Sequence, residues 1–336
     1  MTTTPPSATP ISTPASPLEP PPPEGGGRLR GLGSVVGIVI SVLALAGVVW
    51  WALRQDAPRL PHTAGQIGAL VLAMALYGFN TLVRSERWHR LLLDDGARPT
   101  RGDSYALTTI GYAVNNVLPA RAGDAVRVVL LAPRAAASRR TVVGTIVAER
   151  LLDVAVILVL FLVVGYAILG EVGGGSVEWI VLATVAVIAV AVAAVALVRR
   201  NERVHDFVAP MLSSTLRLLG RHGVLFVAMT FAVWLIEACA WIAVGASVGF
   251  GMSFLEGLYL VALASVFALI PSGPGYAGTQ DAATAIGIKA IGGSGATAVS
   301  YLLMLRFALL VPITVVGFVL LIARYGGLAR VRAARA

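Results

Sequence analysis

The chain has 336 residues, of which 57% are hydrophobic and 13% are charged, and its mean hydropathy is +0.83. This composition excludes a soluble protein with one core, because several apolar runs approach the ~20 residues that cross a bilayer. The net charge of +9 is spread over the connections between apolar runs, which argues against a nucleic-acid partner. Lys289 is the only lysine among the 26 basic residues. A GC-rich genome explains that bias, although arginine also binds phosphate better than lysine does.

The N-terminal segment differs from the rest of the chain. Residues 1–27 are rich in Pro, Ser and Thr and have no apolar period, so we expect a disordered cytoplasmic tail. It does not resemble a signal peptide, because no basic start is followed directly by an apolar core. We expect residues 28–325 to form one transmembrane domain with halves near 32–170 and 177–325. Residues 326–336 then form a basic cytoplasmic tail.

Long apolar runs predict membrane-spanning helices. These runs are Val35 to Trp51, Gly68 to Phe79, Val154 to Leu169, Ile180 to Val198, Val224 to Phe250 and Ala296 to Ala323. Connections rich in arginine alternate with connections that have few or no basic residues: the first of these has Arg54 and Arg59, partly offset by Asp56, and the later ones are rich in glycine and have none. Because short basic loops stay in the cytoplasm, this alternation places both termini inside, in a multi-pass protein of the plasma membrane.

Two polar segments broken by proline and glycine interrupt apolar sequence, and we expect them to act as gates or hinges. The residues of these breaks are Pro119 and Gly123 in the first, and Pro271, Gly273, Pro274 and Gly275 in the second. The flanking arms, about 14 and 11 residues in the first segment and about 17 in the second, barely reach across a bilayer core at ~1.5 Å per residue. We therefore read 104–133 and 254–292 as re-entrant helical hairpins, with full spans as the alternative.

The order of elements is then two spans, a hairpin and a span, followed by the same series again. This order predicts an all-α polytopic transmembrane bundle of about six full spans plus two re-entrant hairpins. Because the hairpins enter from opposite faces, the halves form an inverted repeat. Each hairpin is followed by a span with an arginine, Arg150 or Arg306. Chance similarity between apolar segments is the alternative.

Polar residues around the first break predict a phosphate pocket. Asn116 precedes the break, and Arg121, Asp124 and Arg127 follow it. Arginine donors and the free amides of a helix N-terminus suit phosphate oxygens. A solvated cytoplasmic loop is the alternative.

A second charged group opens the following span. Glu149, Arg150 and Asp153 share one helix face by their spacing. Unpaired charges would each cost ~2.5–3.5 kcal/mol at mid-membrane, so we expect partners from the first hairpin, such as Arg121 or Arg127. A structural ion cluster and a substrate-binding cluster are both compatible with this pattern.

Three further features carry predictions. Glu237 lies alone in an apolar run, and we expect an ion pair with Arg306; a gating or proton-linked role is the alternative. Tyr276 lies among small residues that let a headgroup approach the backbone. Residues 84–93, with Arg87 and Trp88, read as an interfacial stretch whose basic groups meet lipid phosphates.

No catalytic or metal-binding pattern is present in the sequence. Cys239 is the only cysteine, and the four histidines share no ligand spacing. The second break lacks the Gly-Lys-Ser/Thr of a nucleotide loop and the frame of a nucleophile elbow. We expect no metal, no cofactor and no enzymatic activity.

These motifs together resemble the lysylphosphatidylglycerol synthase transmembrane region, a flippase-like membrane family. The residues that carry the resemblance are Arg87 with Trp88, 116–124 with Arg127, 149–153 and 271–279. It covers about residues 32–325. In the family a glutamate commonly follows the second loop, whereas here the nearest acid is Asp281, after Gln280.

The resemblance implies a lipid flippase without the soluble synthase domain to which such regions are fused elsewhere. We expect it to move a phosphate-bearing lipid, an anionic phospholipid or a polyprenyl phosphate, and with no ATP motif the transport is downhill or ion-coupled. The alternatives are an integral-membrane transferase acting on a lipid-linked substrate, with Asp124 and Asp153 as base or metal ligands, and a non-catalytic partner of a separate lipid synthase. A homo-oligomer is a further expectation that the sequence leaves open.

Overall fold

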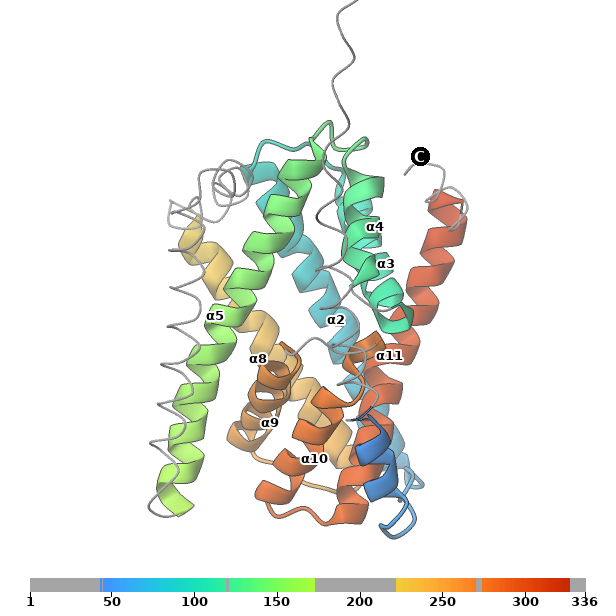
Figure 1. The fold of residues 1–336 in the computed structure, drawn as a ribbon, viewed down its shortest axis with the longest axis vertical. Coiled ribbons are helices and arrows are strands. Elements are labelled where there is room, and N and C mark those ends of the chain that lie inside the picture. Colours follow the sequence, from blue (N-terminus) through green and yellow to red (C-terminus); the bar gives the residue numbers. More distant parts are fainter. Residues whose placement is uncertain (1–42, 44, 119–120, 173–221, 270–273, 327–336) are drawn as a thin grey trace, which may run out of the picture.

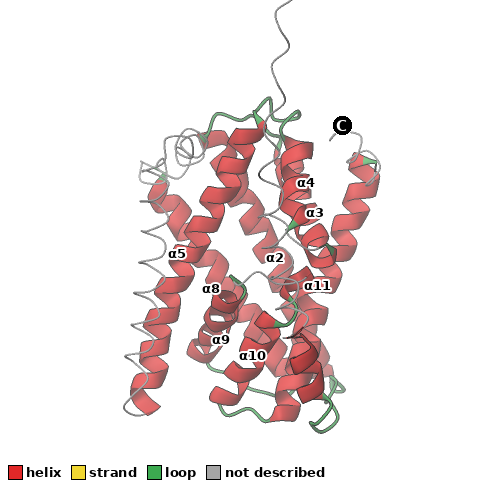
Figure 2. Cartoon of the chain, in the orientation of Figure 1, coloured by secondary structure: helices red, strands yellow, loops and turns green. Residues whose placement is uncertain are grey.

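The computed structural model describes residues 43, 45–118, 121–172, 222–269 and 274–326, and every regular element within them is a helix (Figures 1 and 2). Several predictions lie outside these residues: the tail 1–27, the span 180–198, most of the run 35–51, and the C-terminal tail beyond Gly326. Of the predicted hinge residues, Pro119, Pro271 and Gly273 also lie outside.

Three of the described helices are long and apolar enough to cross a membrane. They are α2 (Ala64–Asp94), α8 (Gly223–Ser247) and α11 (Gly295–Tyr325). The 31 residues of α2 rise about 46 Å, which exceeds the ~30 Å apolar core of a bilayer. The helix α5 (Arg139–Val172) is longer still, with 34 residues. The prediction of a helical membrane protein is confirmed.

The first polar break joins two short helices that pack tightly together. These are α3 (Arg101–Val117) and α4 (Ala122–Leu131). A Cβ added to Gly123 would lie 1.9 Å from the carbonyl oxygen of Gly111, so the two backbones touch. The Asn115 side chain accepts a hydrogen bond of 2.8 Å from the Gly123 amide. The predicted helix break is therefore a turn closed by a backbone contact that only glycine permits.

The second break has the same general form. Helix α9 (Phe254–Phe267) and helix α10 (Thr279–Ala290) pack against each other, and the 3-10 turn η2 (Pro274–Tyr276) precedes α10. A capping box of Ser253 and Glu256 starts α9, and Asp281 accepts a hydrogen bond from the Gly278 amide at the start of α10. Each polar segment thus separates two helices of 10 to 17 residues.

The two helix pairs lie at opposite ends of the molecule with their breaks facing its middle. Figure 1 shows α3 and α4 in the upper half and α9 and α10 in the lower half, flanked by the long helices α2, α5, α8 and α11. Each pair has its own apolar core: Trp88 and Leu107 belong to the first, and Trp241 and Tyr301 belong to the second. This arrangement brings the two breaks toward each other at mid-height.

Candidate functional site

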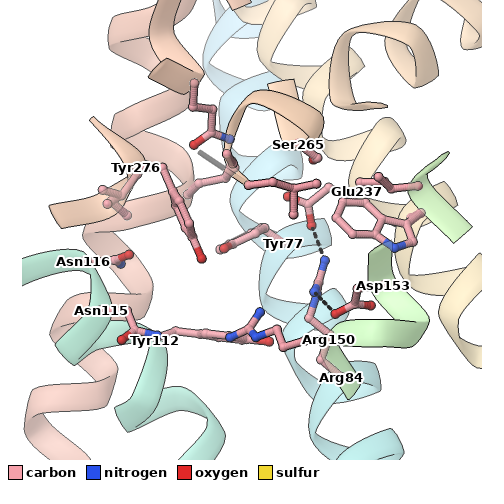
Figure 3. Close-up of a pocket in the computed structure, with 18 of the residues that line it drawn as sticks. Tyr77, Arg84, Tyr112, Asn115, Asn116, Arg150, Asp153, Glu237, Ser265 and Tyr276 are labelled. Carbon is pink, nitrogen blue, oxygen red and sulfur yellow. Dashed lines mark hydrogen bonds and ion pairs between the residues drawn. The ribbon is translucent and has the colours of Figure 1, made fainter. Parts of the chain in front are cut away.

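A cavity of about 200 Å³ lies where the two breaks meet. Asn115, Asn116 and Arg121 line it from the first break, and Gly275 and Tyr276 line it from the second (Figure 3). The predicted site residues Asn116, Arg121 and Tyr276 therefore face one space, although Tyr276 is 160 positions from Asn116 and 155 from Arg121 in the chain.

The long helices add charged and aromatic side chains to this cavity. Arg84 comes from α2, Arg150 and Asp153 from α5, and Glu237 from α8. The aromatic lining consists of Tyr77, Tyr112, Trp234, Trp241 and Tyr276. The cavity is polar at its charges and apolar elsewhere, as small-molecule sites usually are.

The two breaks contact each other through residues with left-handed backbone. Arg121 has φ 52° and Tyr276 has φ 57°, a conformation that is uncommon for residues other than glycine. The Arg121 guanidinium lies over the Tyr276 ring at 5.6 Å from its centroid. Gly275 also has a left-handed backbone, with φ 60°, which glycine adopts without steric cost. Backbone outliers of this kind concentrate at functional sites.

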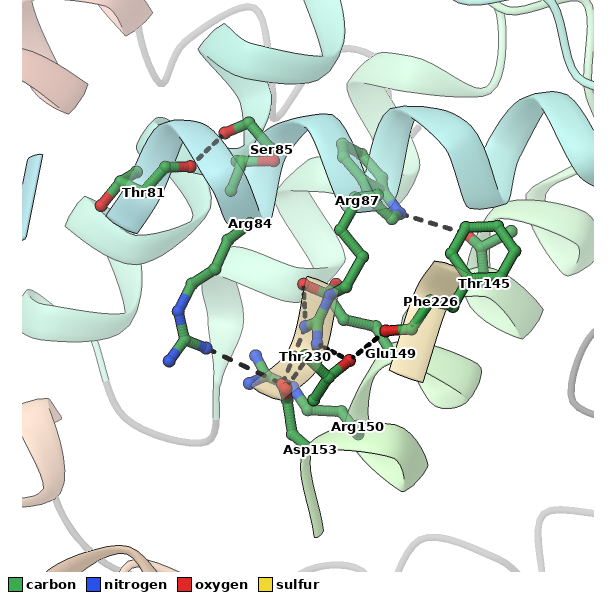
Figure 4. A network of polar contacts seen from close by, with 12 residues as sticks. Thr81, Arg84, Ser85, Arg87, Thr145, Glu149, Arg150, Asp153, Phe226 and Thr230 are labelled. Carbon is green, nitrogen blue, oxygen red and sulfur yellow. Dashed lines mark hydrogen bonds and ion pairs between the residues drawn. The ribbon is translucent and has the colours of Figure 1, made fainter. Parts of the chain in front are cut away.

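Arg87 is the centre of a buried ion network behind the cavity. Its Nη1 and Nη2 donate to the two Asp153 oxygens at 2.7 and 3.1 Å, and Nη2 also donates to Glu149 at 3.2 Å (Figure 4). Nη1 additionally reaches the Thr230 hydroxyl at 2.7 Å. The Arg87 side chain is 0% exposed, so this guanidinium holds α2, α5 and α8 together.

Arg127 extends the network to the first hairpin. It donates to Glu149 at 2.9 Å and lies 3.6 Å from Asp124, while its guanidinium stacks 3.9 Å above the Trp88 ring. Asp124 in turn accepts from Arg150 at 3.3 Å. The predicted pairing of the 149–153 cluster with the first hairpin is confirmed, and of the two candidate partners the structure selects Arg127.

Arg84 connects this network to Glu237. Its guanidinium lies 3.8 Å from Asp153 and 3.4 Å from Glu237, and 5.0 Å from the Trp234 ring centroid. Asn80 also donates to Glu237 at 2.5 Å. Both acids that line the cavity are therefore linked to one arginine that also lines it.

The predicted ion pair between Glu237 and Arg306 is wrong. Arg306 instead binds Asp281 of α10 in a two-pronged contact at 2.8 and 2.6 Å and lies 3.5 Å from the Gly275 carbonyl. Asp281 lies closer along the chain, and its place in the first turn of α10 turns it toward α11. Glu237 meets α2 because α8 packs against α2.

The interfacial reading of residues 84–93 is wrong for its central residues. Arg87 and Trp88 are both 0% exposed, and Trp88 donates from Nε1 to the Thr145 hydroxyl at 3.1 Å. Because acids of α5 face them, these groups serve the protein interior and not lipid phosphates. Arg90 does face outward, with a side chain that is 43% exposed.

The predicted residues divide into two groups. Asn116, Arg121, Arg150, Asp153, Glu237, Gly275 and Tyr276 line the cavity, whereas Asp124, Arg127, Glu149 and Arg306 form ion pairs around it. The polar and aromatic lining residues that sequence reasoning missed are Tyr77, Arg84, Tyr112, Trp234, Trp241, Ser265 and Gln280. A signal existed only for Arg84, which lies three positions before Arg87 on the same helix face.

Several hydrogen-bond donors at the cavity have no partner. They include the Tyr112 hydroxyl, Arg150 Nε and Trp234 Nε1. All three residues line the cavity, but the donor atoms themselves have almost no exposed surface, so a ligand would meet them only after these side chains turn toward the cavity. Within the described ranges, no cluster of three His, Cys, Asp or Glu residues is placed to hold a metal ion.

Comparison with known proteins identifies one family. The family model described as the lysylphosphatidylglycerol synthase TM region matches residues 34–317. Neither a search of curated proteins nor a search of solved structures returns a match. The matched range contains every residue of the cavity.

Proposed function

Because the chain belongs to the lysylphosphatidylglycerol synthase TM region family, we propose that it is a flippase that moves a phosphate-bearing lipid across the bacterial plasma membrane. The observation that carries this proposal is the cavity between the two helix breaks, whose lining includes three arginines. Charged groups at membrane depth usually mark a substrate path.

Only some of the arginines are free to bind a headgroup. Arg87 and Arg127 are fully buried and bound to carboxylates, so they support the site and do not touch its ligand. Arg84, Arg121 and Arg150 line the cavity. The headgroup phosphate would therefore meet these three residues.

The charges of the cavity favour an anion. Arg84 is matched by Glu237, Asp153 by Arg87, and Arg150 by Asp124, whereas Arg121 forms no ion pair within the described part of the chain. One positive charge is thus left for the ligand. A phosphate brings the opposite charge and acceptor oxygens for the guanidinium of Arg121.

The arrangement of the two helix pairs supports an alternating-access mechanism. In each pair an acid in the first turn of the second helix binds an arginine of the next long helix. These contacts join Asp124 to Arg150 and Asp281 to Arg306. We propose that α3–α4 and α9–α10 are re-entrant hairpins of an inverted repeat of about six full spans. Rocking of the two halves would then expose the cavity to one face at a time, with both termini in the cytoplasm.

The contact of Arg121 with Tyr276 is suited to be the gate. It joins the two breaks directly, and both residues have left-handed backbone. A headgroup phosphate on Arg121 would withdraw the guanidinium from the ring, because the ion pair is the stronger interaction. Ligand arrival would in this way separate the two hairpins.

A reconstituted assay tests the function. The protein is placed in vesicles of phosphatidylglycerol and phosphatidylethanolamine that contain trace fluorescent phosphatidylglycerol, and movement between leaflets is followed by quenching of outer-leaflet dye. Losing one charge-assisted hydrogen bond costs ~1.5–3 kcal/mol, so Arg121→Ala and Arg150→Ala should each slow transfer by roughly tenfold or more. Arg90→Ala, which removes an outward-facing arginine of α2, is the matched control. Full transfer by both variants at wild-type protein levels would disprove the site, and a repeat with fluorescent polyprenyl phosphate tests the other lipid class.

A transferase acting on lipid-linked substrates has less support. The acids that would serve as base or metal ligands, Asp124 and Asp153, are both bound by arginines. Lipid analysis of a deletion strain separates the two: a missing product indicates an enzyme, and a normal pool with altered sidedness indicates a flippase. Co-purification tests the third reading, a partner of a separate synthase.

A further inference from the structure

Two acids line the cavity, Asp153 and Glu237. Among the described residues, the only ion-pair partner of Glu237 is Arg84, which lines the cavity as well. Glu237 is 8% exposed, and its carboxylate accepts hydrogen bonds from Asn80 at 2.5 Å and from Arg84 at 3.4 Å. The other lining acid, Asp153, has a bidentate partner behind the cavity in Arg87. Loss of Arg84 would therefore leave Glu237, but not Asp153, without a cation.

Arg84 is held more loosely by its carboxylates than Arg87 is. Its two carboxylate contacts measure 3.4 and 3.8 Å, whereas the contacts of Arg87 with Asp153 measure 2.7 and 3.1 Å. Arg84 also lines the cavity, so a phosphate there can draw its guanidinium away from Glu237. A phosphate is the stronger partner where it accepts two donors of one guanidinium.

Asn80 can form a hydrogen bond with Glu237 when that carboxyl group is protonated as well as when it is charged. The amide oxygen of Asn80 is buried and has no hydrogen-bond partner, while the amide nitrogen donates to the carboxylate. A half-turn of the amide would present that oxygen to an O–H on Glu237, so the same two residues can pair in either protonation state.

The other described titratable and charged groups around Glu237 are either uncharged or paired with another residue, so Arg84 supplies the positive charge that balances Glu237. Tyr77 from α2 and Tyr112 from α3 line the cavity as neutral phenols. From α11, Tyr301 donates to the Trp241 carbonyl and Arg306 is bound to Asp281. The polar residue that α9 contributes to the cavity is the uncharged Ser265. From α5, Asp153 is held by Arg87, and Arg150 lies against Asp124.

We propose that Glu237 is a proton-binding site coupled to the anionic headgroup through Arg84. When a phosphate takes Arg84, Glu237 binds one proton from water, so one negative charge enters the cavity and one is neutralised. The proton leaves when the headgroup departs and Arg84 returns. This inference rests on the proposed function and adds to it the ion that accompanies the lipid.

Thermodynamic linkage between proton binding and phosphate binding fixes the direction in which pH changes the headgroup affinity. If the phosphate strengthens proton binding by Glu237, protonation strengthens phosphate binding by the same factor. Headgroup affinity therefore rises as the pH falls through the range in which Glu237 titrates. We expect a change on the order of tenfold, which corresponds to about one unit in proton affinity.

The binding experiment uses purified protein in dodecyl maltoside micelles and dihexanoyl phosphatidylglycerol as the probe. A phosphodiester keeps one negative charge across the range tested, so the ligand contributes no pH dependence of its own. Fluorescence of Trp234 and Trp241, which line the cavity, reports binding at low and high pH. Wild type should bind the probe more tightly at low pH, and Glu237→Gln should bind it equally at both. Glu256→Gln, which changes an acid that caps α9, should behave as wild type.

A second measurement needs no variant. Titration calorimetry of the wild-type protein in two buffers with different ionisation heats counts the protons taken up with each probe molecule, and we expect roughly one. Zero uptake overturns the coupling, as does an unchanged pH dependence in Glu237→Gln. Absence of probe binding at every pH removes the anion site and with it both proposals. Lipid transfer in the vesicle assay without proton uptake leaves the flippase intact and rejects only the coupling.

Discussion

Replacement of Arg87 should destabilise the protein far more than replacement of the cavity arginine Arg121. In Arg87→Met, Glu149 keeps Arg127 at 2.9 Å, but Asp153 keeps only Arg84 at 3.8 Å. The variant therefore contains a buried carboxylate without a close cation.

The size of the effect follows from that uncompensated charge. Breaking a buried ion pair by removing one partner costs ~3–5 kcal/mol. Because the unfolding entropy grows with chain length, 1 kcal/mol corresponds to roughly 1.4 °C for 336 residues, and the melting temperature should fall by about 6 °C. Arg121→Ala removes only a cation–π contact of ~0.5–1 kcal/mol, so its melting temperature should fall by about 1 °C.

A double-mutant cycle isolates the interaction between Arg87 and Asp153. Arg87→Met combined with Asp153→Leu removes one charge of each sign, and it leaves the three arginines Arg84, Arg127 and Arg150 with three acids. Because the uncompensated charge disappears, the double variant should regain ~2 kcal/mol or more relative to the sum of the two single changes. Thermal unfolding in maltoside micelles, followed by tryptophan fluorescence, measures all four proteins.

Two results would refute this reasoning. If Arg87→Met and Arg121→Ala lower the melting temperature equally, the division into supporting and ligand-binding arginines fails. If the double variant is as unstable as the two single effects added together, the contact of Arg87 with Asp153 is not what stabilises the bundle.

Three further changes probe the hairpins and their anchors, each measured by thermal unfolding beside wild type. Gly123→Ala should cost ~1–3 kcal/mol or more because the new methyl group meets the Gly111 carbonyl; an unchanged melting temperature would contradict the backbone contact. Asp281→Asn should cost ~1–3 kcal/mol because it leaves Arg306 without its carboxylate, and an effect near zero would remove that anchor. Arg324→Ala should cost less than ~1 kcal/mol because this ion pair is half exposed, and a larger loss would show that the end of α11 is more tightly held.

Local features of the fold could be predicted from the sequence. The breaks near Gly123 and Gly275 were recognisable because glycine and proline act within a few residues of themselves. The closeness of Asp124 to Arg127, now 3.6 Å, followed from helical spacing alone. Sequence reasoning succeeded where a contact spans one or two helical turns.

Pairings between distant helices could not be predicted in the same way. Arg84 and Arg87 stand at the end of an apolar run, a position that is also typical of lipid-facing residues, and only the packing of α5 and α8 beside α2 decides between the two environments. Glu237 could have met any buried arginine, and the nearer acid Asp281 had already taken Arg306. The sequence shows that these charges need partners, but the packing of distant helices determines which partner each charge has.

The ion pairs of Arg84 and Arg87 with acids of α5 and α8 have a consequence for how the protein is inserted during synthesis. The helix α2 is synthesised with Arg84 and Arg87 well before α5 brings Asp153 and Glu149, and Glu237 follows only with α8. During that interval the two guanidiniums lack the acids that pair with them in the folded protein, and an unpaired arginine at the centre of a bilayer costs ~2.5–3.5 kcal/mol. Stable integration of α2 therefore waits for α5, and a polypeptide truncated before that helix should be recognised by membrane quality control as unassembled.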